Sequence, residues 1–227
     1  NVYRDVSLAL SNELSLSCEK LKVDYLEAQA AANTQPFCHL LRPGIVAGHI
    51  PKDPYLLLEE AENANAKLAI VALARRINDE MLDHTVQLAK DGLGERDRPL
   101  KGAKVALLGV SYRANVKEPR GTAVTQLVKM LTTKGAATRM FDPLYSYDEL
   151  KEIGLPAQRT LEKTVEGTDC LVIVVGHNRF RHLNLKKLKL LMTKAATIVD
   201  MGQAIQPGKA EKAGFIYRAV GRGVHVI

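Results

Sequence analysis

The sequence is poor in several residue types that specialised classes of protein need. It has no tryptophan, and aromatic residues make up only 5% of its 227 residues. No basic segment is interleaved with Phe or Tyr, so there is no stacking surface for single-stranded nucleic acid. The three cysteines form no C-x-x-C pair, which excludes a disulfide framework and a thiolate metal site. The histidines are scattered without ligand spacing, and we predict no metal site.

Long apolar runs are also absent. No run reaches the roughly 18 residues that a membrane span needs. Residues 1–7 lack the apolar core of a signal peptide, so we expect a cytoplasmic protein with no membrane partner. The net charge of +7 is compatible with nucleic acid or an anionic ligand. Because aromatic residues are few, we expect no nucleic-acid partner.

What the first 93 residues do contain is helical periodicity. The apolar positions that recur at this spacing are Val6, Leu10, Leu14 and Leu21, and later Ile70, Leu73, Ile77, Met81 and Leu88. Between these two helices, residues 34–55 are too rich in proline and glycine for a regular element. This segment is either an ordered functional loop or a simple connection.

The periodicity changes after a Gly- and charge-rich stretch at 94–102. Five short apolar segments then alternate with helical ones, beginning at Lys104, Ala137, Cys170, Ala196 and Phe215. Apolar strands alternating with helices predict a parallel sheet that is covered on both faces. We therefore predict an α/β protein with a helical domain (1–93), a linker (94–102) and a Rossmann-like, doubly wound domain (103–227).

Ligands of such sheets bind beyond the carboxyl ends of the strands. The loop after the first strand has Gly109 but not the G-x-G-x-x-G fingerprint of a dinucleotide site. It carries Arg113, Lys117 and Arg120 ahead of a helix, which is compatible with a phosphate site or with a solvated basic loop. Asp142 follows the second strand, where it could accept from a ribose hydroxyl or begin an Asp-Pro turn.

Several motifs in order along the chain resemble one known family. They are NVYRDVSLALSNEL at 1–14, RPG at 42–44 with VAGHIPKDPYLL at 46–57, LLGVSYRANVKEPRGTA at 107–123, FDP at 141–143 and DCLVIVVGHNRF at 169–180. Together they are similar to the UDP-glucose/GDP-mannose dehydrogenase family. The VKEPR variant favours the members that oxidise UDP-N-acetylhexosamines such as UDP-N-acetylmannosamine.

The resemblance implies an anatomy and a reaction. Members have an NAD-binding Rossmann domain, a central helical dimerisation domain and a C-terminal domain that holds the nucleotide of a UDP-sugar. They oxidise the C6 alcohol of the sugar to a carboxylate in two NAD-linked steps, through a thioester on a cysteine. By the resemblance this chain covers the central and C-terminal domains, forms a homodimer, binds a UDP-sugar and depends on NAD held mainly by a domain outside it.

The resemblance also implies site residues. Asn1 and Asp53 match catalytic positions, and Asp53 corresponds to the Asp that positions the water and the nucleophile. Gly48, His49 and Arg113 match the substrate-binding positions. Two further residues, Lys52 and Arg120, match positions that face the cofactor.

The sequence departs from the family pattern at the nucleophile. The family has a Cys between the His and the Ile-Pro of this motif, but here His49 is followed directly by Ile50. Ala47 replaces the glycine that lets the sugar approach, and Phe37 replaces an Arg that reaches into the partner's site. Cys38 lies in the same loop but does not align with the nucleophile. Without a covalent intermediate the second oxidation should stop, so we expect this chain alone to be inactive.

Two functions of different class fit these residues. The first is part of an NAD-dependent UDP-sugar 6-dehydrogenase. The second is a non-catalytic, degenerate module that dimerises and binds a nucleotide sugar.

Overall fold

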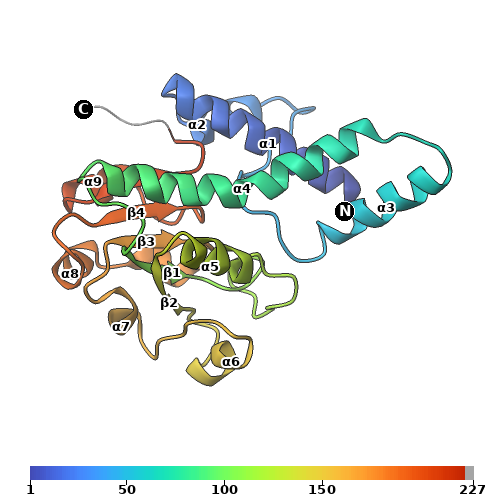
Figure 1. The fold of residues 1–227 in the computed structure, drawn as a ribbon. Helices are drawn as coiled ribbons and strands as arrows, with labels where there is room; N and C mark the ends of the chain where they lie inside the picture. The colour runs from blue at the N-terminus through green and yellow to red at the C-terminus, as the bar shows by residue number, and fades with distance from the viewer. Residues whose placement is uncertain (223–227) are drawn as a thin grey trace. The chain divides into compact units, whose positions relative to one another are not determined.

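The computed structural model describes residues 1–222 (Figure 1). These form two compact units, which we describe separately. The first contains Asn1–Asp83 and the described end of the chain from Val220, and the second contains His84–Ala219. No helix among the described residues is long and apolar enough to cross a bilayer.

The first unit is helical. Its elements are α1 (Val2–Leu21), α2 (Tyr25–Ala32), α3 (Lys52–Asn63) and the first turns of α4 (Ala69–Gly94). The periodicity predicts α1 and α4. The prediction that residues 34–55 hold no regular element is wrong at their end, because α3 begins at Lys52, directly after Pro51. The buried face of α1 is polar or small, and its members are Asp5, Ala9, Ser11, Asn12 and Ser15. The apolar residues whose spacing predicts this helix lie on its exposed side, where Leu10 is 49% exposed and Leu21 is 73% exposed. The same periodicity that indicates a helix therefore does not mark the face that α1 buries within one chain.

The second unit is built on a parallel sheet of five strands. The strands are β1 (Lys104–Leu108), β2 (Ala137–Phe141), β3 (Cys170–Ile173), β4 (Thr197–Asp200) and β5 (Ile216–Ala219). Their order is β2-β1-β3-β4-β5. The connecting helices are α5 (Val124–Thr133), α6 (Tyr147–Glu152), α7 (Leu161–Val165), η1 (Asn178–His182), α8 (Leu185–Leu191) and α9 (Pro207–Lys212).

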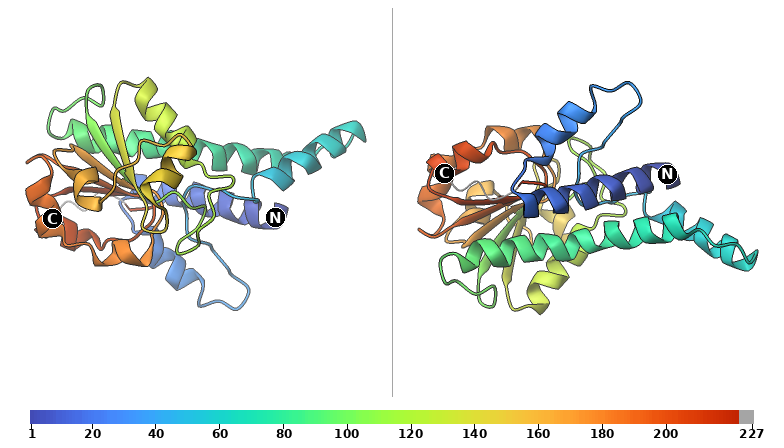
Figure 2. Two further views of the ribbon diagram at one scale, coloured as in Figure 1. Left: turned by 90° about the horizontal axis from the view of Figure 1, so that it is seen from below. Right: turned by 90° about the horizontal axis from the view of Figure 1, so that it is seen from above.

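Helices cover both faces of this sheet, as Figure 2 shows. On one face, alternate strand residues such as Leu171 and Ile198 pack with α8 and α9 in one buried cluster. The other face is covered by α5 and the end of α4, where a Cβ on Gly92 would lie only 2.4 Å from Thr197 Cγ2. Burial of both faces explains why the inner strands β1 and β3 are almost continuous apolar runs, whereas the edge strands β2 and β5 include Arg139 and Arg218.

The strand order reverses between β1 and β3, which defines the point where ligands of doubly wound sheets bind. The chain leaves β1 through Gly109, which has φ +96°. A Cβ atom added to this residue would lie only 2.7 Å from Val175 Cβ. Only glycine fits this combination of backbone angle and close approach. The loops after β1 and β3 are thereby brought together at the carboxyl edge.

The predicted fold class is confirmed: the protein is α/β, with a helical part followed by a doubly wound parallel sheet. The limits 1–93, 94–102 and 103–227 stay predictions. The two compact units divide inside α4, between Asp83 and His84. Residues 223–227, which the prediction includes in the last domain, lie outside the described residues.

Candidate functional site

Two of the predicted site residues are in direct contact in the first unit. Asn1 precedes α1 and Asp53 lies in the first turn of α3, 52 positions later. Asn1 Nδ2 donates to Asp53 Oδ2 at 2.5 Å, and both residues are exposed. The resemblance assigns both to catalysis, and the structure places them where one reacting group could meet both side chains.

The other predicted residues of this unit lie in the turn before α3. Gly48 has φ +74°, and the Lys52 amide donates to the His49 carbonyl at 3.3 Å, which closes the turn. The side chains of His49 and Lys52 are exposed. The turn is therefore displayed at the surface, with Asp53 directly after it.

The loop that leads to this turn is ordered by polar side chains of α1 and α2. Leu41 N donates to Ser11 Oγ at 2.9 Å, and Tyr25 Oη donates to the Leu41 carbonyl at 2.9 Å. Asn12 pairs with the backbone of Gly44 in both directions, since Gly44 N donates to Oδ1 at 2.7 Å and Nδ2 donates to Gly44 O at 3.1 Å. Of the two interpretations of residues 34–55, the structure favours the ordered loop.

A buried polar network supports this loop from α4. Asn12 Nδ2 donates to Asn78 Oδ1 at 2.9 Å, and Asn78 Nδ2 donates to Asp5 Oδ1 at 2.8 Å. Arg75, only 2% exposed, donates to the same carboxylate oxygen at 2.5 Å and also pairs with Asp79. Burial opposes the charge on Arg75, but the carboxylates of Asp5 and Asp79 outweigh it and raise the pKa of Arg75 above its ordinary value.

The network reaches α3 through Tyr55. Its hydroxyl donates to Asp79 Oδ2 at 2.5 Å, and the Arg75 guanidinium lies 5.3 Å from the centre of the Tyr55 ring. The hydrogen bond to Asp79 and partial burial raise the pKa of Tyr55. Polar side chains therefore link α1 and α3 to α4 and hold the loop against α1. The ion pairs of Arg75 with Asp5 and Asp79 are part of this network.

In the second unit the predicted cations lie in the long loop between β1 and α5. Arg120 is paired with Glu118, through Nε at 3.0 Å and Nη2 at 2.7 Å. Lys117 is paired with Glu149 of α6, and this contact is the main reason why the pKa of Glu149 lies below its usual range. Arg113 is exposed and stacks near the Tyr112 ring, 5.7 Å from its centre. Within residues 1–222 Arg113 forms no ion pair, so of these three cations it is the one open to an anion.

Asp142 lies at the end of β2 and is fully buried. Its Oδ1 accepts from Leu144 N at 2.8 Å, an Asx turn, while Oδ2 accepts from Val110 N at 2.7 Å. His177, which follows β3, also contacts Oδ2 through Nε2 at 3.1 Å. Of the two interpretations of Asp142, the structure supports the turn, because no part of the carboxylate is exposed to a ribose.

The three cysteines differ in exposure and in the pKa of the thiol. Cys170 is buried in β3, and burial raises the pKa of its thiol to about 12. Cys18 lies in α1, and burial with the neighbouring carboxylates of Asp24 and Glu19 raises its pKa. Cys38 is a partly exposed free thiol in the loop. No described cluster of three or more His, Cys, Asp or Glu side chains could hold a metal ion.

Two family models match the chain. The model of the UDP-glucose/GDP-mannose dehydrogenase central domain matches residues 1–80, and the model of that family's UDP binding domain matches residues 106–207. The chain belongs to the UDP-glucose/GDP-mannose dehydrogenase family. The second match covers the sheet from within β1 to β4, the loop that carries Arg113 and the Asp142–His177 contact, and it ends before β5.

Individual relatives agree with the family models. The UDP-N-acetyl-D-mannosamine dehydrogenase of Pyrococcus horikoshii is 33% identical over 225 residues, which are 98% of this chain and 50% of the relative. The solved structure titled as UDP-D-ManNAc dehydrogenase of the same organism superposes with a TM-score of 0.84 at 31% identity, covering 98% of this chain and 50% of that chain. The NDP-N-acetyl-D-galactosaminuronic acid dehydrogenase of Methanosarcina mazei Go1 gives 0.89 at 26% identity, with 99% and 50% covered. The chain spans about half the length of the curated relatives it matches.

The described residues do not form an NAD pyrophosphate site. In a dinucleotide-binding fold the glycine-rich turn after the first strand leads directly into a helix, whose N-terminus faces the pyrophosphate. Here β1 ends at Leu108 and α5 begins at Val124, and Thr122 Oγ1 already accepts from Val124 N at 3.2 Å.

Sequence reasoning missed the buried polar groups. The network residues Asp5, Asn12, Arg75 and Asn78 were not candidates, although two signals were available. Asp5 and Asn12 lie seven positions apart on one face of a helix, and Arg75 and Asn78 lie three apart on another. The sequence analysis gives His177 no role, since it is one of the scattered histidines. Its contact with Asp142 depends on strand order, which the local sequence does not specify.

Proposed function

We propose that this chain is the central and UDP-binding part of an NAD-dependent UDP-sugar 6-dehydrogenase, and that the nucleotide binds at the carboxyl edge of the sheet between β1 and β3. The observation that supports this most directly is the match of residues 106–207 to the UDP binding domain of the family. The relatives named for UDP-N-acetyl-D-mannosamine favour a UDP-N-acetylhexosamine as substrate. NAD would bind to a part of the enzyme outside the residues described, with Lys52 and Arg120 facing it.

In this proposal the residues of the chain have distinct tasks. Arg113 binds the diphosphate, because a guanidinium offers two parallel donors to phosphate oxygens. Gly48 and His49 contact the sugar from their exposed turn. Asn1 and Asp53 hold the reacting C6 group and a water molecule, for which their 2.5 Å contact provides a paired donor and acceptor. The UDP-sugar would be the principal small-molecule partner.

The binding role of Arg113 is tested by calorimetry with UDP. Arg113→Ala should weaken UDP binding by about 1–3 kcal/mol, the scale of charge-assisted hydrogen bonds. Arg120→Ala should cost less, since Glu118 already neutralises that guanidinium. Lys129→Ala, which removes an exposed cation from α5, serves as the control for the loss of one positive charge. Equal effects of Arg113→Ala and Lys129→Ala would contradict the assignment.

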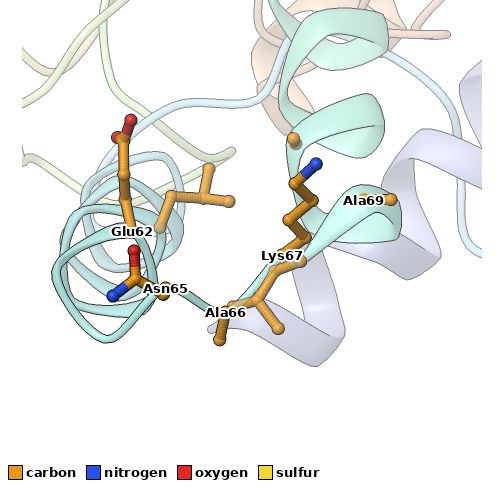
Figure 3. A pocket seen from close by; sticks show the side chains of 8 residues that line it. Glu62, Asn65, Ala66, Lys67 and Ala69 are labelled. Atoms are coloured by element: carbon orange, nitrogen blue, oxygen red, sulfur yellow. The ribbon is translucent and has the colours of Figure 1, made fainter.

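We also propose a homodimer formed through the first unit. Exposed apolar side chains of this unit include Leu56, Leu57, Ile70 and Leu73 on α3 and α4. A pocket of about 590 Å³ lies where α3 ends and α4 begins, with Ala66, Leu68 and Ala72 among its apolar lining (Figure 3). An exposed apolar surface of this kind is typical of a protein interface.

Sedimentation velocity tests the dimer. The chain should sediment as a dimer at micromolar concentration, and Ile70→Asp, which places a charge on a side chain that is 70% exposed, should shift it towards monomer. Leu190→Asp on α8 of the second unit, where the side chain is 87% exposed, should leave the dimer intact. A wild-type chain that sediments as a monomer would refute the proposal.

One observation favours the second candidate function, a non-catalytic module. The segment Gly48-His49-Ile50 has no residue in the place of the family's nucleophile, and neither Cys18 nor Cys170 can replace it. Such a module would still bind a UDP-sugar and dimerise. The two candidate functions therefore differ in whether the sugar is oxidised, while both include binding of a UDP-sugar.

A further inference from the structure

We propose that the buried pair Asp142–His177 is a positioning device that holds the loop carrying Arg113, and that it makes binding of a UDP-sugar dependent on the protonation of His177. This inference rests on the proposed function, because it assigns a role to the loop of the proposed nucleotide site. His177 would be a positioning residue that acts through the loop and not by touching the ligand.

The hydrogen bonds on Asp142 fix the tautomer of His177. An ionised carboxylate only accepts hydrogen bonds, and Asp142 Oδ2 already accepts from Val110 N at 2.7 Å. The His177 nitrogen at 3.1 Å from the same oxygen must therefore carry a proton. The ring is 1% exposed, and Phe180 packs edge-on against it with 5.4 Å between ring centres. The imidazole is therefore held as a donor through Nε2.

The opposite nitrogen of the ring is then free to accept. Asn115 N, in the loop after β1, donates to His177 Nδ1 at 2.9 Å. Neutral imidazole has one donor and one acceptor, and this arrangement uses both. The chain of contacts runs from the end of β2, through the residue after β3, to the loop after β1.

Asn115, whose amide donates to His177, lies in the middle of the loop after β1. Asn115 has φ +60°, a left-handed conformation that few residue types other than Asn, Asp and Gly adopt. Its side-chain oxygen accepts from Asn178 N at 2.9 Å. The loop has no helix or strand of its own, and Arg113 lies two positions before this anchor. Holding the loop before the ligand arrives reduces the entropy lost on binding.

Protonation of His177 would release this anchor. A proton on Nδ1 would face the N–H of Asn115, so one hydrogen bond becomes a contact between two donors. The ionisable group that contacts the ring is Asp142, on Nε2, and Tyr145 after β2 interacts with that carboxylate. Lys117 lies over the Tyr145 ring and pairs with Glu149, and Arg179 of η1 lies over Phe141, the residue before Asp142. The contact with Asp142 needs a proton on Nε2 in either form, so the contact that is lost is the one with Asn115. Affinity for a UDP-sugar should therefore fall as the pH falls.

Two substitutions separate the two nitrogens of the ring. His177→Asn leaves an amide oxygen near the position of Nδ1, so it keeps an acceptor for Asn115 that does not titrate. His177→Gln leaves an N–H for Asp142 but removes that acceptor. His182→Asn, at the exposed end of η1, is the matched control for the loss of a histidine.

The probe is UDP-N-acetylglucosamine, whose diphosphate diester does not titrate between pH 5.5 and 7.5, measured by calorimetry on the 227-residue chain. Wild type and His182→Asn should lose about tenfold in affinity from pH 7.5 to 5.5, the scale of one hydrogen bond. His177→Gln should be about tenfold weaker than wild type already at pH 7.5. His177→Asn should show the same affinity at both pH values. Thermal unfolding confirms that each variant is folded.

Hydrogen exchange of the Asn115 amide measures, in the absence of ligand, whether its hydrogen bond to His177 is formed. It should be protected in wild type and in His177→Asn, and exposed in His177→Gln. If wild type binds equally at both pH values, or if the Asn115 amide exchanges alike in all folded variants, the inference is wrong. If wild type binds no UDP-sugar while the amide follows the expected pattern, the proposed nucleotide site is wrong and the positioning of the loop is still supported.

Discussion

Arg75→Met should destabilise the protein by about 3–5 kcal/mol, because it leaves the carboxylate of Asp5 buried without its charged partner. Asp5 is fully buried, and its Oδ2 has no hydrogen-bond partner within the described residues. The substitution leaves Asn78 as the side-chain donor to Oδ1. In a thermal melt the midpoint should fall by about 10 °C for a chain of this size.

Two further variants make this test specific. Arg76→Met removes the neighbouring guanidinium, which is exposed, and should change stability by less than about 0.5 kcal/mol. The double variant Asp5→Leu with Arg75→Met replaces the whole ion pair by apolar groups and should recover most of the loss. Equal melting temperatures for Arg75→Met and Arg76→Met would show that the network does not stabilise the first unit.

The second large effect concerns the proposed loss of the family's nucleophile after His49. We expect that the first half of a family relative, joined ahead of Asn1, gives a chimera that carries out at most a slow first oxidation of a UDP-sugar. Insertion of a Cys after His49 should raise complete oxidation to the acid by several orders of magnitude, since a covalent intermediate replaces a step that has no catalyst. NADH formation, counted per sugar consumed, measures this directly.

The control for this experiment is a Ser inserted at the same place, which restores the length of the loop without the thiol. If the Ser insertion performs as well as the Cys insertion, loop length and not the nucleophile limits the reaction. If the chimera without insertion oxidises the sugar fully, the alignment at His49 is wrong. Cys38, the partly exposed thiol of the same loop, would then be the first residue to substitute.

The sheet could be predicted from the sequence because its inner strands are buried on both faces. A run such as CLVIV at 170–174 has no polar position to suggest another structure, and the structure begins β3 at Cys170. Apolar periodicity predicted α1 and α4 of the first unit but not the shorter helices α2 and α3. The buried face of α1 was not predicted, because α1 buries Asp5, Asn12 and Ser15 and leaves Leu10 exposed. A pattern based on apolar residues alone does not reveal a polar interface.

The candidate site was predictable where it follows the family motifs and unpredictable where it depends on contacts across the fold. Asn1 and Asp53 came from the resemblance, and their contact joins residues 52 positions apart. The role of His177 depends on Asp142, 35 positions earlier, and on Asn115, 62 positions earlier. Such contacts follow from strand order, which becomes visible only once the sheet is assembled.

The central claim is that the carboxyl edge between β1 and β3 holds the nucleotide of a UDP-sugar. The most direct measurement is an NMR titration of the ¹⁵N-labelled chain with UDP, with the backbone amide shifts assigned. The account predicts saturable shifts that concentrate at residues 109–117 and 174–178, and their loss in Arg113→Ala. Saturable shifts confined to other parts of the chain, or none at millimolar UDP, would contradict it.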